Sequence, residues 1–157
     1  MRELEHTLES LGYRYQILKE GERVQSIVIP VEVNDLEFPI QCFRLDEPPT
    51  YLFMVGTIAW PNSEQQALGD FLWRLLAGGF GLYTYGKISM RRESQESLMF
   101  VDAAIPAEGL NPENVKFLIQ NLSAEIATFA AQFESMVPEG KRSAYRPNFE
   151  HVHAKAQ

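Results

Sequence analysis

The order of the elements predicted along this chain constrains its fold more than any single motif does. Stretches in which apolar residues recur every three or four positions alternate with stretches in which every second residue is apolar. These are the periods of an amphipathic helix and of a half-buried strand. They predict a helix, three strands, a helix, a two-strand hairpin and a third helix. This order, α-β-β-β-α-β-β-α, predicts an α+β fold with an antiparallel sheet. We expect one domain over residues 1–138 and a polar C-terminal tail at 139–157.

The first half of the chain is predicted to hold the first helix and the three strands. Leu4, Leu8 and Leu11 share one helical stripe, and Gly12 follows where a left-handed residue commonly ends a helix. Pro30 cannot donate a hydrogen bond to a neighbouring strand, so it predicts an edge position or a bulge. The third strand is apolar on both faces, which is typical of a central strand in a covered sheet. The strands are expected at residues 26–33, 38–43 and 51–59.

The second and third helices carry recognisable start and stop signals. Ser63 and Gln66 have the spacing of a capping box, in which two side chains bond free amides at a helix start. Gly78-Gly79 ends this second helix. Asn111-Pro112 places a capping residue before a proline at the first helical position, and the third helix is expected to end near Val137.

The hairpin between these helices has a register that follows from its turn. A turn at residues 94–97 places Met90 opposite Val101, so that apolar residues of the two strands share one face. The two strands are expected near residues 88–92 and 99–105.

Asp102 is the acidic residue that most needs an explanation, because it interrupts an apolar strand. In the predicted register it faces Ser89, with Lys87 and Arg91 on the diagonals. A cross-strand ion pair on the outer face of the hairpin is therefore favoured over a catalytic role.

Other candidates for chemistry also have structural interpretations. The cluster at residues 78–81 leaves a helix C-terminus, whereas phosphate loops lead into a helix N-terminus. His151 and His153 supply two ligands in the tail, and a zinc site normally needs at least three. The sequence therefore predicts no catalytic residue, no cofactor and no metal.

Composition restricts the class of partner and the compartment. The chain has 157 residues, a formal net charge of -7 and one cysteine. This acidic balance disfavours binding to nucleic acid, since a phosphate backbone selects clusters of Lys and Arg. From the sequence we expect neither a signal peptide nor a segment long enough to span a membrane. Cys42 lies in a strand pattern and is expected to be buried in a reducing compartment, so we predict a cytoplasmic protein.

The second helix carries a second apolar stripe in addition to the one expected to face the core. Its members follow one another at spacings of four, three and four. Either the third helix or a second copy of the chain can cover it, and we favour a homodimer because symmetric dimers are the commonest assemblies. The candidate dimer-interface residues are Gly69, Trp73, Leu76 and Phe80.

Over residues 4–137 the element order, length and acidity resemble the type III secretion chaperone-like superfamily, which includes the bacterial YbjN-like proteins. The resemblance implies an α+β fold, a homodimer built from the second helix and the later strands, and a non-enzymatic role in binding protein segments. The long tail differs from a secretion chaperone and favours the YbjN-like branch. From the faces on which they lie, the candidate partner-binding residues are Leu4, Leu8, Val28 and Phe43.

Two function hypotheses remain. The first is a non-enzymatic dimeric protein-binding module, chaperone-like or regulatory, with an unidentified protein partner. The second is a small-molecule binding protein or weak enzyme with a pocket between the second helix, the sheet and residues 78–85, where Tyr83 and Tyr85 would line a cleft.

Overall fold

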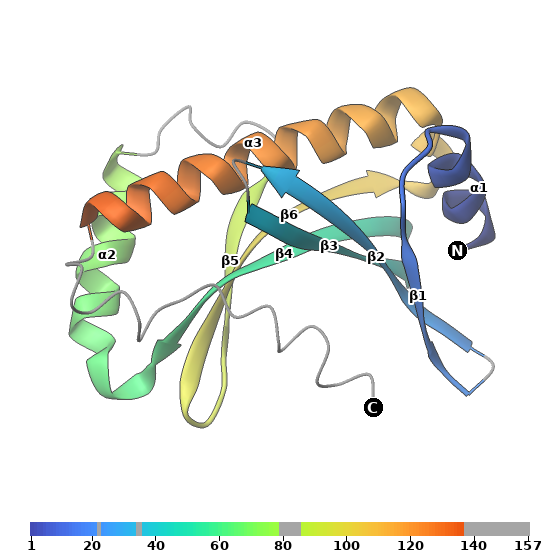
Figure 1. Cartoon of the computed structure of the whole chain (residues 1–157). Coiled ribbons are helices and arrows are strands. Elements are labelled where there is room, and N and C mark those ends of the chain that lie inside the picture. The colour runs from blue at the N-terminus through green and yellow to red at the C-terminus, as the bar shows by residue number, and fades with distance from the viewer. Residues whose placement is uncertain (22, 34–35, 79–85, 137–157) are drawn as a thin grey trace.

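A computed structural model describes residues 1–21, 23–33, 36–78 and 86–136 as three helices and a six-stranded antiparallel sheet (Figure 1). The strand order across the sheet is β1-β2-β3-β4-β6-β5. Short 3-10 turns, η1 (Asn62–Glu64) and η2 (Ala107–Gly109), precede α2 and α3. The bounds are α1 (Arg2–Ser10), β1 (Gln16–Glu20), β2 (Arg23–Val33), β3 (Leu36–Asp46), β4 (Pro49–Pro61), α2 (Gln65–Gly78), β5 (Lys87–Arg92), β6 (Glu96–Pro106) and α3 (Pro112–Met136).

The helices cover one face of the sheet. In Figure 1, α3 lies across this face, with α1 beside one of its ends and α2 beside the other. The strands direct every second side chain toward these helices, which is the period of a pleated sheet. Cys42 of β3, Phe53 of β4 and Val101 of β6 are among these side chains, and all three are fully buried. The core therefore lies between this face and the three helices.

Local signals set where the helices begin and end. Gly12 adopts a φ of 74° directly after Leu11, the C-cap residue of α1, as predicted. Asn111 caps α3, because its Oδ1 accepts the backbone N–H of Asn114 at 2.9 Å. Ser63 lies inside η1, and α2 begins at Gln65, so the predicted start of the second helix was two residues too early.

The structure adds one strand to the prediction. β1 lies at the edge of the sheet and pairs with β2 from Gln16, opposite Val28, to Glu20. Its sequence, QILKE, lacks the alternation that identified the other strands. β4 occupies the interior position predicted for the third strand, between β3 and β6.

Pro30 does not lie on an edge strand, because β2 is flanked by β1 and β3. Only the part of β2 that contains Pro30 lacks a neighbour on one side. β1 reaches only to Val28, so Pro30 lies beyond its end. Pro30 is paired with Pro39 of β3, and the β3–β4 pairing begins only at Gln41. The tip of the β2–β3 hairpin therefore extends past both neighbouring strands.

The predicted register of the last hairpin is wrong by two residues. Met90 faces Met99, and Lys87 faces Asp102. The chain turns at Ser94 and Gln95, and the Glu93 N–H donates to the Glu96 carbonyl at 2.8 Å. Because the error is an even number of residues, each side chain stays on its predicted face.

Candidate protein-binding surface

The sheet face turned away from the helices carries large apolar side chains that lie outside the core cluster. We call this surface the open face. Most of its members are half-buried, and Leu45 is 46% exposed. All except Leu45 alternate with core residues on the same strand, and none is among the residues that form or pack against the core cluster. The open face consists of Phe43, Leu45, Leu52, Met54 and Phe100.

The strand registers make these residues neighbours. Phe43 of β3 lies directly opposite Leu52 of β4. Met54, two positions further along β4, lies opposite Asp102, and Phe100 is two positions from Asp102 on β6. Direct and diagonal pairs of this kind are close enough for large side chains to touch. The open face is therefore one patch that crosses β3, β4 and β6.

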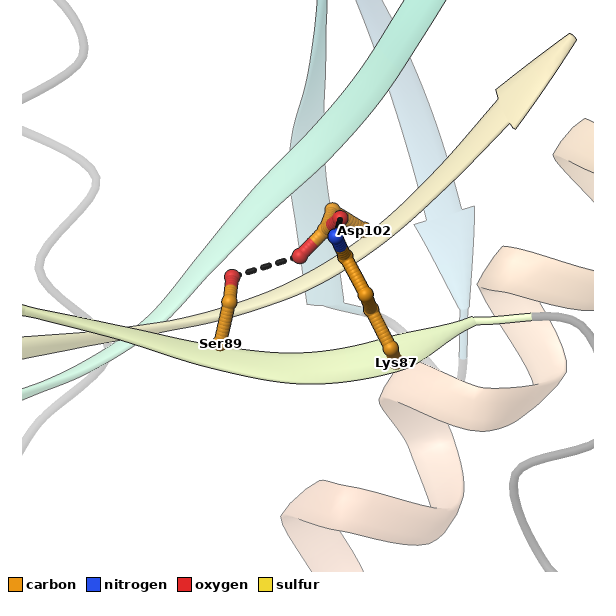
Figure 2. A network of polar contacts seen from close by, with 3 residues as sticks. All are labelled: Lys87, Ser89 and Asp102. Carbon is orange, nitrogen blue, oxygen red and sulfur yellow. Dashed lines mark hydrogen bonds and ion pairs between the residues drawn. The ribbon is translucent and has the colours of Figure 1, made fainter.

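One side of the open face ends in a polar cluster (Figure 2). The Asp102 side chain is 4% exposed, and its carboxylate accepts the Ser89 hydroxyl at 2.5 Å and contacts the Lys87 Nζ at 3.3 Å. The predicted ion pair is thus confirmed for Lys87. A buried carboxylate is costly unless it is paired and hydrogen-bonded, and here it is both. This arrangement gives Asp102 a structural role in joining β5 to β6.

Arg91 does not pair with Asp102, because the register places it opposite Leu98. Its guanidinium lies over the Phe100 ring, with 5.8 Å from Cζ to the ring centroid, and it contacts the Glu93 carboxylate at 2.8 Å. A cation over an aromatic face is attracted by the ring quadrupole. The open face therefore has a border of paired charges, in which exposed Lys87 is paired with Asp102 and Arg91 with Glu93.

The second apolar stripe of α2 faces away from the core. Trp73 is 75% exposed, the highest value among the large apolar residues of the described chain. Gly69 is also exposed, and a Cβ built there meets no atom within 4 Å. The opposite side of α2 buries Phe71, whose ring stacks on Trp60 at 5.4 Å. Of the remaining stripe residues, Leu76 belongs to α2 but its side chain is not described, and Phe80 lies outside the described residues.

The four candidate partner-binding residues do not form one accessible surface. Leu4 and Leu8 are 0% exposed and belong to the core between α1 and the sheet. Val28 is 4% exposed and Phe43 is half-buried. Phe43 and Val28 do lie on the same sheet face, because Val28 is paired with Gln41, which is two residues from Phe43 on β3. Of the four, Phe43 is the one that contributes to the open face.

Sequence reasoning missed Leu52, Met54 and Phe100. The signal was present, because 51–59 is apolar at both parities and Phe100 alternates with buried Met99 and Val101. That pattern is also typical of a sheet covered on both faces, which is the prediction made from the sequence. All three described helices pack on the same face, so the second set of apolar side chains remains without a helix above it.

Other groups singled out in the sequence have structural surroundings. Cys42 is buried in β3, and burial raises the pKa of its thiol. No cluster of three or more His, Cys, Asp or Glu side chains suited to a metal occurs within residues 1–21, 23–33, 36–78 and 86–136. His151, His153, Tyr83 and Tyr85 lie outside those ranges.

The lengths and compositions of the helices also bear on membranes. None of the helices in the described part of the chain is both long and apolar enough to cross a bilayer.

Comparison with known proteins identifies the fold. No family model matches the chain, and no curated protein matches it in sequence. The crystal structure of YbjN from E. coli, described as a candidate transcription regulator, superimposes with a TM-score of 0.53 and 16% identity. That alignment covers 82% of this chain and 89% of YbjN. A chain of the HopA1–SchA chaperone–effector complex aligns with a TM-score of 0.47 and 15% identity, over 80% of this chain and 88% of that one.

The predicted fold class is therefore confirmed. The chain has the α+β fold of YbjN, with an antiparallel sheet and three helices. At 16% identity this likeness concerns the arrangement of the backbone.

Proposed function

We propose that this chain is a non-enzymatic, homodimeric protein-binding module of the YbjN-like branch, chaperone-like or regulatory, in the bacterial cytoplasm. The module is one domain over residues 1–138 with a polar tail. The observation that carries the proposal is the open face, an apolar patch across three strands with no described helix above it. A contiguous apolar patch of this kind marks an interaction surface.

The open face is the proposed partner surface. Its apolar centre around Phe43, Leu52 and Met54 supplies contact area, and the ion-paired side chains of Lys87 and Arg91 form a polar rim. Interfaces commonly combine an apolar centre with a polar rim. Leu4 and Leu8 are buried and hold α1 against the core, so their role in this proposal is to stabilise the domain and not to contact the partner.

A non-enzymatic role is supported by the state of the two groups best suited to chemistry. The Asp102 carboxylate is held by Ser89 and Lys87. The Cys42 thiol is buried, and its raised pKa keeps it protonated, whereas the thiolate is the reactive form.

The proposed dimer forms through α2. Trp73 is largely exposed in the isolated protomer, and Gly69 leaves space for the close approach of a second backbone. Burying an indole of this exposure contributes on the order of 3 kcal/mol to the free energy of association. In a two-fold symmetric dimer both protomers bury their Trp73, so the contribution is made twice.

The dimer is tested by the molar mass of the parent chain and of Trp73→Glu, measured by light scattering. We expect a dimeric parent and a monomeric variant with an unchanged circular dichroism spectrum. Ala67→Glu adds the same charge at another exposed position of α2 and should remain dimeric. A monomeric parent at tens of micromolar would overturn the dimer.

The partner surface is tested by affinity capture from the native lysate with matched variants. Leu45→Asp places a charge on the open face, and Met90→Asp places one at a residue of similar exposure on the opposite face, 49% against 46%. We expect the same stoichiometric partner with the parent and with Met90→Asp, and its loss with Leu45→Asp. Capture of no stoichiometric partner by the parent, or equal capture by Leu45→Asp, contradicts the proposal.

A further inference from the structure

The side of the sheet that carries the open face also holds apolar side chains that are buried away from the helices. Leu98 is two positions from Phe100 on β6, and Val28 shares the face of Phe43. Leu98 and Val28 are each 4% exposed, yet neither belongs to the core cluster. Arg91, opposite Leu98, extends its guanidinium over the Phe100 ring. Because side chains stand roughly perpendicular to a sheet, neighbours on the same face leave their tips open. The three described helices do not supply the missing cover.

The open face has the shape of a diagonal stripe. Leu45 lies at the level of Thr50 on β4, and Phe100 lies at the level of Gly56 on the same strand. The other three members lie between these two ends. With about 3.3 Å per residue along a strand and about 4.8 Å between strands, the stripe is about 22 Å long. Its width is one or two side chains, so it fits a single segment of chain lying lengthwise.

The last helix ends near the Phe100 end of this stripe. Phe133, in the last turn of α3, contacts Phe71 at a centroid distance of 6.0 Å, and Phe71 stacks on Trp60. Trp60 of β4 is four residues from Gly56, which is paired with Phe100. A chain that leaves α3 needs about 25 Å to pass this end of the sheet and reach Phe100 on the other side.

The segment that follows α3 matches these distances in its length and its apolar content. Residues 137–144 span up to roughly 27 Å when extended, which is enough to pass the end of the sheet. Residues 145–152 contain Tyr145, Phe149 and Val152 among polar side chains. This second part spans up to roughly 24 Å, which is the length of the stripe.

Charge also favours contact between this segment and its own domain. Residues 137–157 contain four Lys or Arg and two Asp or Glu, whereas the whole chain has a net charge of -7. The remainder of the chain is therefore more acidic than the whole, and opposite net charges attract. Because the segment is covalently attached, its effective concentration at the stripe is on the order of millimolar. Even a weak apolar contact is then populated within one molecule.

We propose that residues 145–152 dock lengthwise on the open face of their own chain and that a protein partner must displace them. Tyr145 lies at the Phe100 end, and Val152 lies at the Leu45 end. This inference rests on the proposed protein-binding role and adds a means of regulating the same site. The apparent Kd of the partner rises as the fraction of molecules with an unoccupied face falls, so that about nine-tenths occupancy weakens binding about tenfold.

Paramagnetic relaxation in the full chain tests the docking and its direction. A nitroxide is attached to Ser143→Cys or to Ala154→Cys, while the native thiol of Cys42 is buried and stays unlabelled. Broadening of amide resonances is then measured by NMR. The label at position 143 should broaden Phe100 most strongly, and the label at position 154 should broaden Leu45 most strongly.

Matched double variants within the segment test which side chains hold it. Tyr145→Ser/Phe149→Ser removes two apolar contacts and should abolish the broadening. The same variant should capture the cellular partner with about tenfold higher affinity than the parent. Asn148→Ser/His151→Ser changes two polar residues of the same segment and should leave both measurements as in the parent.

The inference is overturned if neither label broadens open-face resonances, if both labels give the same pattern, or if Tyr145→Ser/Phe149→Ser leaves the broadening unchanged. These outcomes differ from failure of the proposed function. Broadening along the stripe with no partner captured by any variant contradicts the proposed function alone. Equal capture by the parent and by Tyr145→Ser/Phe149→Ser, without broadening and with loss of capture in Leu45→Asp, contradicts this inference alone.

Discussion

At the scale of single residues, Gly86 and Glu125 join the start of β5 to the middle of α3. Glu125 is 5% exposed, and its Oε2 accepts the Gly86 N–H at 2.8 Å. A Cβ on Gly86 would collide with that same oxygen and would lie 2.9 Å from Val101 Cγ1. A glycine is needed here for a close approach to a side chain.

Gly86→Ala is therefore expected to lower the free energy of unfolding by about 2 kcal/mol, because it displaces a buried, charge-assisted hydrogen bond and crowds the core. Urea denaturation followed by circular dichroism measures the change. Gly109→Ala is the matched control, since its Cβ would make only ordinary contacts of 3.6 Å and 4.0 Å. Equal stabilities of the two variants would contradict the steric argument.

Cys42 gives a second prediction at this scale. Burial raises the pKa of its thiol above the ordinary value of about 8.5, so that the folded state holds it protonated at a pH where the unfolded chain ionises. Its contribution to stability is complete below that ordinary value and is lost as the pH rises above it. We expect a disulfide reagent at pH 8.5 to label the native chain at least about a hundredfold more slowly than the urea-unfolded chain. Comparable rates would show that the thiol is accessible in the native state.

At the scale of elements, aromatic contacts hold α2 against β4 and α3. Phe71 stacks on Trp60, and its edge-to-face partners Phe129 and Phe133 lie at centroid distances of 6.1 Å and 6.0 Å. These rings are buried. The position of the exposed stripe on α2 follows from this one cluster, because rotating Phe71 into the core turns Trp73 outward.

We expect Phe71→Ala to cost about 4 kcal/mol in the free energy of unfolding, the usual range for a buried phenylalanine. The same substitution at half-exposed Phe117 should cost about 1 kcal/mol. Guanidinium denaturation of both variants gives the comparison. If the two losses are equal, the cluster does not hold α2 in place.

The elements also show which features the sequence could predict. The three helices and the faces of the strands followed from periodicity, and the Asn111 cap followed from capping chemistry. β1 could not be predicted, because its residues 16–20 do not alternate and are held by pairing with β2. The hairpin register was wrong because the face pattern is unchanged by a shift of two residues, so the pattern cannot distinguish a two-residue turn from a longer one.

The candidate surfaces were predictable to different degrees. Trp73 was identified because a helix with two apolar stripes can bury only one of them on a sheet. The open face depends on tertiary placement. The sequence shows that Met54 is apolar, but it does not show whether a helix packs above that side chain.

At the scale of the whole molecule, the sheet is paired unevenly. β4 is flanked by β3 and β6 along residues 50–54, whereas β1 and β5 lie at the two edges. Amides in doubly flanked strands open only when most of the domain opens.

Hydrogen exchange should therefore be slowest at residues 50–54 of β4 and 97–102 of β6, which are flanked on both sides, and faster in β1 and β5, with protection in β1 at least about tenfold lower. Exchange of the intact chain, read by NMR or mass spectrometry, measures this order. Equal protection throughout the sheet would mean that the domain opens as a single cooperative unit.

The tip of the β2–β3 hairpin has a further consequence. Pro30 and Pro39 face each other where the hairpin extends past β1 and β4. The two prolines form a pair that is not hydrogen-bonded to each other, so the backbone groups of each point away from the hairpin. On that outer side each proline lacks the N–H that another strand would need. A second molecule that tried to continue the sheet from either side would meet a missing donor. The two prolines thus protect this acidic chain against edge-to-edge aggregation.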